Sequence, residues 1–370
     1  MRVIASSPLR PRLAPLDLEP VRWMTARFPE AHLREVAIVR APKLDRRADP
    51  SGRTRVWLAL EALQITGSFK VRGAIVALDR VLRAQGPGAR VVSASRGNHG
   101  RGVAYAARVL GLEATILVPP SSPRAGWARI AREANAVVLS GSDDRSETEA
   151  EAAALAEEIG ASFISACDDI DVVSGNGGSL GFEIVRGVRT IPDIVFVPLG
   201  GGGLATGLAH ALATESEACR VSRRVWGVQS EASPTMALSL ERGEAVEPGR
   251  AAGPTLATRL QCGISKAGFA RAREAIAGVV VVRESQIAEA MDYCRREMGL
   301  VIEGSAAASL APVLHGLPED LLTPPGHVSN DPVRCPRNAD LVVVLTGRNI
   351  EGGELGTLSS SRRSRPAYTP

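Results

Sequence analysis

The chain has 370 residues, 45% of them hydrophobic, and a formal net charge of +4 from 44 basic and 40 acidic side chains. A chain of this length can bury a large core, which favours two domains. Basic and acidic residues are mixed along the whole chain and aromatic residues make up only 4% of it, so we expect no nucleic-acid partner. Residues 1–20 lack the apolar core of a signal peptide, and no segment is predicted to span a membrane.

Cysteine usage favours a reducing compartment. The five cysteines lie far apart and form no C-x-x-C pair, which argues against a zinc site and against a disulfide framework. Their positions are Cys167, Cys219, Cys262, Cys294 and Cys335. We therefore predict a cytoplasmic protein.

Short apolar runs alternate with longer segments of helical period. In chain order these are a strand and helix in 91–111, a strand at 114–120, a helix at 124–135, a strand at 136–141, a helix at 146–160 with Ser146 as a candidate cap, a strand and helix in 194–212, and a strand at 341–349. Such alternation is typical of an α/β protein with open, twisted, mostly parallel sheets.

Three of these apolar runs end in glycine-bearing turns, "SRGNHG" (95–100), "GGGG" (200–203) and "TGRN" (346–349). Open α/β sheets bind their ligands at the carboxyl ends of parallel strands. Glycines there let backbone N–H groups approach an anion, and a following helix adds its positive end. We expect the three turns to face one crevice.

The run "PLGGGGLATG" gives the strongest anion signal, and it predicts a phosphate site followed by a helix from Leu204. A dinucleotide is the competing ligand. Gly200, Gly202 and Ala205 satisfy G-x-G-x-x-G/A, and Glu231 after the next strand could bind a ribose. That fingerprint is weak by itself and leaves the other two turns unexplained.

Lys70 is one of only three lysines, with Lys43 and Lys266, in a chain whose basic residues are otherwise arginine. Arginine carries surface charge as well as lysine does, but its guanidinium cannot act as a nucleophilic amine. The preceding "GSF" predicts that Lys70 begins a helix beside an aromatic ring. An exposed helix position is the plain structural alternative. A phosphate site together with a nucleophilic lysine suggests pyridoxal phosphate.

Four motifs, "TGSFKVRGA", "SRGNHGRGVAYAA", "PLGGGGLATG" and "VIEGSAAASL", occur in the order seen in fold-type II pyridoxal-phosphate enzymes. The chain resembles the serine/threonine dehydratase group most, over roughly residues 21–350. The resemblance implies a two-domain α/β fold similar to tryptophan synthase β. Its expected parts are an N-terminal extension (1–20), a large cofactor-binding domain (21–88 and 168–352), a small inserted substrate-loop domain (89–167) and a disordered tail (353–370).

The resemblance also implies the roles of individual residues. Lys70 is expected to bind the cofactor covalently and to move the substrate's α-proton. The expected cofactor contacts are Phe69 on the pyridine ring, Asn98 at the ring hydroxyl, and Gly200, Gly201, Gly202, Gly203 and Leu204 around the phosphate. The expected substrate loop contains Ser95, Arg96, Gly97, Asn98 and His99.

Thr346 takes the position that faces the pyridine nitrogen in the family. A hydroxyl there does not force the nitrogen to be protonated, so the ring is a weaker electron sink and chemistry at Cβ is favoured over transamination. Ordinary β-propensity is the alternative reason for a threonine at a strand end.

Several positions depart from the dehydratase pattern. Arg96 fills the variable place of the substrate loop, where we expect it either to contact a second anionic group or to point to solvent. Gly177 stands where glutamine is usual, which could open space near the ring. Gln229 and Thr235 occupy positions that align with acidic cation ligands, so no Mg²⁺ or Ca²⁺ is expected there, with Glu231 as the reservation.

The predicted function is a pyridoxal-phosphate-dependent lyase that removes the β-substituent of an amino acid such as threonine, serine or an acidic analogue, giving a 2-oxo acid and ammonia. The alternatives are a β-replacement synthase of a specialised amino acid, a nicotinamide-dependent oxidoreductase, and a catalytically silent member of the family. A homodimer acting on a small amino-acid substrate is expected.

Overall fold

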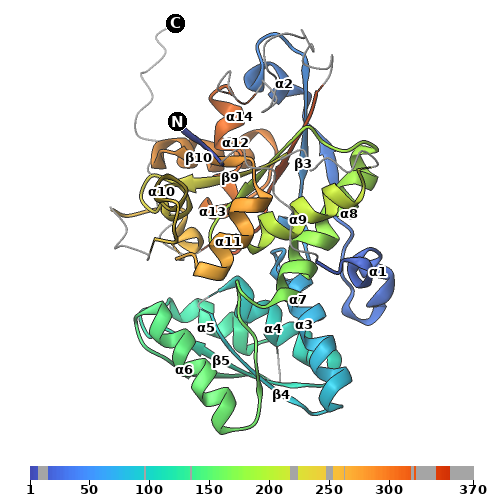
Figure 1. Cartoon of the computed structure of the whole chain (residues 1–370), viewed down its shortest axis with the longest axis vertical. Coiled ribbons are helices and arrows are strands. Elements are labelled where there is room, and N and C mark those ends of the chain that lie inside the picture. The colour runs from blue at the N-terminus through green and yellow to red at the C-terminus, as the bar shows by residue number, and fades with distance from the viewer. Residues whose placement is uncertain are drawn as a thin grey trace, which may run out of the picture.

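The computed structural model describes residues 1–6, 16–95, 97–133, 136–216, 224–246, 253–261, 263–317, 321 and 339–350. Arg96 and the tail 353–370 lie outside this set. Figure 1 shows a larger sheet with helices on both sides, and below it a smaller sheet packed with α4, α5 and α6. Within the described residues, no helix combines the length and the hydropathy needed to cross a bilayer.

Seven strands form the larger sheet, in the order β1-β10-β9-β8-β11-β3-β2, and four form the smaller one, in the order β6-β5-β4-β7. The strand bounds are β1 Arg2–Ala5, β2 Ile38–Arg40, β3 Thr54–Ala59, β4 Arg90–Ala94, β5 Glu113–Val118, β6 Ala136–Ser140, β7 Ser162–Phe163, β8 Ile194–Pro198, β9 Val225–Ser230, β10 Gly278–Val282 and β11 Ala339–Val344. Only the pairings of β1 and β2 at the two edges of the larger sheet are antiparallel among these described strands.

Helices connect the parallel strands. The α-helices are α1 Met24–Arg27, α2 Pro42–Ala48, α3 Lys70–Gln85, α4 Asn98–Leu110, α5 Arg124–Ala131, α6 Arg145–Glu158, α7 Ile170–Val173, α8 Ser179–Val188, α9 Gly203–Thr214, α10 Thr235–Arg242, α11 Lys266–Ala275, α12 Glu284–Glu297, α13 Gly304–Ala307 and α14 Ala311–Leu314. Short helical turns are η1 Glu19–Val21, η2 Pro29–Ala31, η3 Glu61–Leu63, η4 Ser174–Gly178 and η5 Thr258–Leu260.

The larger sheet is buried on both faces, which explains why its strands read as nearly continuous apolar runs. Alternate residues of β8 show this directly. Ile194 and Phe196 pack into a core with helices α2, α12, α13 and α14, whereas Val195 and Val197 face a second core with α8, α9, α10 and α11. The α/β fold with mostly parallel sheets is confirmed.

Helix α3 packs on the smaller sheet rather than on the larger one. Ala74, Ile75 and Leu78 of α3 share a buried cluster with Val103 of α4 and Ile116 of β5. The domain limits predicted from sequence placed this helix with the large domain (21–88). In the structure the helix that begins at Lys70 therefore joins the two sheets.

Two local expectations differ from the structure. Residues 1–20, predicted as an extension, supply β1, which pairs with β10 at the edge of the larger sheet. The helix predicted from Ser146 begins at Arg145, and the Asp144 carboxylate caps it by accepting hydrogen bonds from the N–H groups of Ser146 and Glu147. Asp144 satisfies these donors because its side chain reaches the second and third helical residues, as capping requires.

Candidate active site

Three strand ends meet at one pocket between the two sheets. Ser95 and Gly97 follow β4, Gly200 to Gly203 follow β8, and Thr346 follows β11, and all of them line this pocket together with Lys70. The expectation that the three glycine-bearing turns face one crevice is confirmed. The carboxyl ends of parallel strands meet there because both sheets present that end to the gap between them.

Lys70 is the first residue of α3, as predicted, and its side chain is half-buried in the pocket. Its Nζ donates a hydrogen bond to the backbone O of Ala166 at 3.0 Å and lies 5.2 Å from the centre of the Phe69 ring. The N–H of Phe69 donates to the backbone O of Thr346 at 3.1 Å, which ties the lysine's turn to the end of β11. The amine therefore points into the pocket and not into bulk water.

The loop 200–203 has the form of an anion cradle. Gly202 has φ +87°, a left-handed conformation that favours glycine, and α9 begins at Gly203 directly after it. A Cβ added at Gly201 would lie 2.5 Å from Sγ of Cys167, so this residue must also be glycine. Leu204 continues the helix and lines the pocket. The N-terminus of α9 thus faces the same cavity as Lys70.

Asn98 is buried at the start of α4 and is held on both sides of its amide. Its Nδ2 donates to both carboxylate oxygens of Glu303, at 2.9 and 3.1 Å. Its Oδ1 accepts from Nδ2 of Asn349 at 2.7 Å. The sequence motif "VIEGSAAASL" contained Glu303, yet no role was assigned to it; a lone glutamate among small and apolar residues was the available signal.

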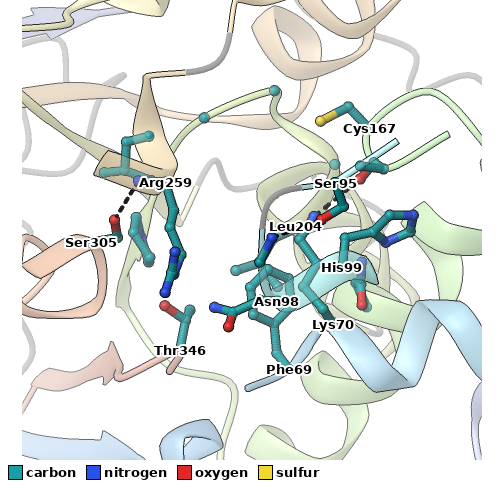
Figure 2. Close-up of a pocket in the computed structure, with 18 of the residues that line it drawn as sticks. Phe69, Lys70, Ser95, Asn98, His99, Cys167, Leu204, Arg259, Ser305 and Thr346 are labelled. Carbon is teal, nitrogen blue, oxygen red and sulfur yellow. Dashed lines mark hydrogen bonds between the residues drawn. The ribbon is translucent and has the colours of Figure 1, made fainter. Parts of the chain in front are cut away.

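Arg259 is the lining residue that the sequence indicated least. It lies on η5, and its Nε donates to Oε2 of Glu303 at 2.9 Å. Its backbone N–H donates to Oγ of Ser305 at 3.1 Å (Figure 2). No motif surrounds Arg259 in the sequence, and only the tertiary structure brings it to the pocket.

The remaining predicted residues lie as follows. Oγ of Ser95 accepts a hydrogen bond from the N–H of Gly97 at 3.2 Å, and His99 is buried next to them in the first turn of α4. Thr346 is 2% exposed, so its hydroxyl faces the pocket interior. Arg96, the predicted contact for an anionic substrate group, lies outside the described residues.

Two sequence expectations are corrected by the structure. Gly177 does not open space near the pocket, because a Cβ there would lie 2.3 Å from the backbone O of Leu204. The glycine instead lets η4 pack directly against α9. Glu231, the candidate ribose ligand, is exposed and is not among the described residues that line the pocket. The described lining therefore lacks the arrangement expected for a dinucleotide.

The amide of Gln229 has a structural role. It is fully buried, its Nε2 donates to the backbone O of Leu199, and its Oε1 accepts from the N–H of Ala237. Both ends of the side chain are thus committed to backbone groups. That no Mg²⁺ or Ca²⁺ binds there stays a prediction.

A buried ion-pair cluster fixes the first turn of α3. Arg72 is fully buried and donates from Nη2 to Glu61 at 2.8 Å and to Glu183 at 2.6 Å. Burial lowers the pKa of Arg72, but the two carboxylates raise it by more, so the guanidinium keeps its charge. Arg72 follows Lys70 by two residues, and its partners lie on η3 and α8. The cluster therefore holds the lysine's helix against the larger sheet.

These residues fit pyridoxal phosphate. The glycine loop leaves room beside a helix N-terminus for a phosphate, and Lys70 presents a primary amine to the same cavity. Thr346 offers a buried hydroxyl, and Phe69 an aromatic surface. A lysine amine, a phosphate cradle and a neutral hydroxyl are the donor set that such a cofactor requires.

Comparison with known proteins agrees with this donor set. A family described as "Pyridoxal-phosphate dependent enzyme" matches residues 30–327. L-threonine ammonia-lyase of Thermotoga maritima is 36% identical over 269 residues, which are 71% of this chain and 63% of that relative. The catabolic L-threonine dehydratase TdcB of Escherichia coli K12 is 32% identical over 299 residues, covering 80% of this chain and 83% of the relative.

Solved structures share the fold. A threonine deaminase whose source is given as T.th. superposes with a TM-score of 0.72 at 29% identity, covering 91% of this chain and 99% of that one. Diaminopropionate ammonia lyase from Escherichia coli superposes with a TM-score of 0.80 at 16% identity, covering 98% and 97%. The family match spans most of the chain, so the protein belongs to the pyridoxal-phosphate-dependent enzymes of this fold.

Proposed function

We propose that this enzyme catalyses an α,β-elimination on a β-substituted amino acid and releases a 2-oxo acid and ammonia. The observation that carries the proposal is the shared pocket of Lys70, the 200–203 loop and Thr346. The similarity to threonine ammonia-lyase and threonine dehydratase supports it. The substrate class proposed is that of threonine, serine or an acidic analogue.

Pyridoxal phosphate, when bound, withdraws electrons from the substrate's Cα and so makes the α-proton removable. In this proposal Lys70 holds the cofactor covalently, and its Nζ accepts the α-proton after the substrate's amine has taken its place. The N–H groups of Gly201 to Gly203, with the N-terminus of α9, bind the phosphate. Phe69 packs against the ring.

The loop 95–99 orients the substrate through its carboxylate, with Ser95, Gly97 and His99 next to Asn98. Thr346 presents a neutral hydroxyl to the ring nitrogen, and a hydroxyl leaves that nitrogen unprotonated more readily than a carboxylate would. Loss of a β-substituent is then favoured over transamination. The placement of a buried hydroxyl at the end of β11 supports this role.

The test measures 2-oxo acid release from serine, threonine, 3-hydroxyaspartate and 2,3-diaminopropionate by the purified holoenzyme. Release from at least one substrate is expected, together with a visible absorption band that borohydride abolishes. Lys70→Ala should lose the band and the turnover, whereas Lys266→Ala, at an exposed helix start, should keep both. A protein with an intact band but no turnover of any amino acid would contradict the proposal.

A β-replacement synthase is separated by the same assay. With a second nucleophile supplied, such an enzyme would make a new amino acid and release little 2-oxo acid. We also propose a cytoplasmic homodimer; the widely spaced cysteines support the reducing compartment. Light scattering of the purified protein tests the dimer.

A further inference from the structure

We propose that Arg259 sets the substrate class of this pocket by binding a second carboxylate, so that the preferred substrate is a β-substituted dicarboxylic amino acid. This inference rests on the proposed elimination, because it concerns the substrate of that reaction. It adds a residue on η5 that no sequence motif indicated. 3-Hydroxyaspartate, which is threonine with a carboxylate in place of its methyl group, is the matched probe.

The guanidinium of Arg259 is held in place from both ends. Nε donates to Glu303 at 2.9 Å, and Nη2 donates to the backbone O of Asn349. The main chain at this point is fixed as well, since the N–H of Arg259 donates to Oγ of the buried Ser305. Its side chain is 16% exposed. A cation held this firmly is pre-organised for a ligand and needs little reordering when one binds.

The same guanidinium borders the proposed substrate loop. A Cβ added at Gly97 would lie 3.1 Å from Nη1 of Arg259, so the backbone of the loop and the arginine are in direct contact. In the view of Figure 2, Arg259 lies on one side of Asn98 and Lys70 on the other. A substrate whose α-carboxylate binds the loop therefore has Arg259 within reach of a second acidic group.

Charge balance favours this assignment. Among the described lining residues the lysine and arginine side chains are Lys70 and Arg259. The amine of Lys70 is committed to the cofactor, so the guanidinium is the permanent cation that remains for the substrate. Glu303 neutralises it only in part, because the same carboxylate also accepts two hydrogen bonds from Asn98. Arginine is the side chain best shaped to bind a carboxylate through two parallel hydrogen bonds.

A purely structural role is the competing explanation. Arg259 could serve only to pair the buried Glu303, and so to hold Asn98 in position. That role predicts equal losses for substrates with and without a second carboxylate. A specificity role predicts a loss confined to the dicarboxylic one, because the site then discriminates by a hydrogen-bonding group that only one substrate carries.

The experiment compares wild type, Arg259→Gln, Arg259→Lys and Arg271→Gln as holoenzymes. Arg271 makes an exposed pair with Asp168 and does not line the pocket, so it controls for the loss of one positive charge. Two readouts are taken: the ratio of kcat/KM for 3-hydroxyaspartate to that for threonine, and the calorimetric Kd of succinate relative to butyrate. Succinate and butyrate have no amino group and cannot react, so binding is measured apart from catalysis.

Wild type should prefer 3-hydroxyaspartate and bind succinate more tightly than butyrate. Arg259→Gln should reduce both preferences by about 10- to 100-fold, the range for a hydrogen bond to a charged group, while Arg271→Gln leaves them unchanged. Arg259→Lys keeps a partner for Glu303 and so serves if the glutamine variant does not fold; it should show a smaller loss in the same direction.

Equal preference in wild type, or a preference unchanged in the variants at 259, would overturn the assignment. Equal losses on both substrates would also overturn it and favour the structural role. If no amino acid is turned over but succinate binding still depends on Arg259, the elimination proposal fails while the carboxylate site stands.

Discussion

The side chain of Asn349 donates a hydrogen bond from Nδ2 to Oδ1 of Asn98 at 2.7 Å, which joins the segment after β11 to the first turn of α4. Asn349 is itself anchored, because Nδ2 also donates to the backbone O of Thr66 and Oδ1 accepts from Arg101 at 3.1 Å. The pair sets which end of the Asn98 amide faces Glu303. Asn349 thus positions a residue to which we assign the cofactor's ring hydroxyl.

Replacing Asn349 with alanine should weaken cofactor binding. The change removes the donor that orients Asn98, and we expect the affinity of the apoprotein for pyridoxal phosphate to fall by about tenfold, as for the loss of one buried hydrogen-bond partner. Absorbance titration with the cofactor measures this. Gln85→Ala, which removes an exposed amide of α3, is the control. An unchanged affinity in Asn349→Ala would show that Asn98 keeps its orientation without Asn349.

A methyl group at Gly201 should damage the phosphate cradle. In Gly201→Ala the new Cβ would lie 2.5 Å from Sγ and 2.8 Å from Cβ of Cys167, so the loop must move. Overpacking of this size costs about 1–3 kcal/mol, and we expect cofactor affinity to fall by about tenfold. Gly253→Ala, where a Cβ meets nothing within 4 Å, should bind normally.

The same clash offers a rescue. Cys167→Gly in the Gly201→Ala background removes both close contacts and should restore part of the lost affinity, as measured by the same titration. If the double variant binds no better than Gly201→Ala, the loop's contact with Cys167 is not the cause of the loss.

Removing the buried Arg72 charge should destabilise the fold. Arg72→Met leaves Glu61 and Glu183 buried without their partner, and breaking such a cluster costs about 3–5 kcal/mol in the free energy of unfolding. Arg83→Met on the same helix breaks an exposed pair with Asp79 and should cost about 0–1 kcal/mol. Urea denaturation of both variants measures the difference. Equal losses would mean that the cluster is not what secures α3.

Asp49 should make stability depend on pH. Burial raises the pKa of this carboxyl, but hydrogen bonds from the hydroxyl and N–H of Ser51 and the N–H of Arg53 outweigh it, so the pKa lies below its ordinary value. A lowered pKa in the folded state contributes stability above the unfolded-state pKa, and that stability is lost as pH falls through the folded-state pKa.

Asp49→Asn should therefore lower the unfolding temperature at neutral pH and lose this effect in acid. We expect a cost of about 1–3 kcal/mol near pH 7, where the charged acceptor is intact in wild type. Thermal melts from neutral to acidic pH should show the two proteins converging as the carboxyl becomes protonated. Glu158→Gln, an exposed carboxylate on α6, should show no such convergence. A constant gap between wild type and Asp49→Asn at every pH would contradict the assignment.

The local parts of this protein were predictable from its sequence. Segments 91–111 and 194–212 each contain a strand, a glycine turn and a helix in one continuous stretch, so the pattern of apolar residues and glycines was enough to place them. Lys70 at the start of α3 followed from the turn before it. Even so, Asp144 rather than Ser146 caps α6, because both residues favour caps and only the backbone path separates them.

What the sequence by itself determined is a parallel α/β chemistry: a lysine at a helix start, a glycine cradle, and a hydroxyl at a strand end. Only the tertiary structure decided which side chains surround them. Arg259, Glu303, Asn349 and Asn98 meet although Asn98 and Asn349 are 251 positions apart, and α3 joins the smaller sheet. Such contacts depend on how the two sheets are set against each other, and no local pattern encodes that distance or orientation.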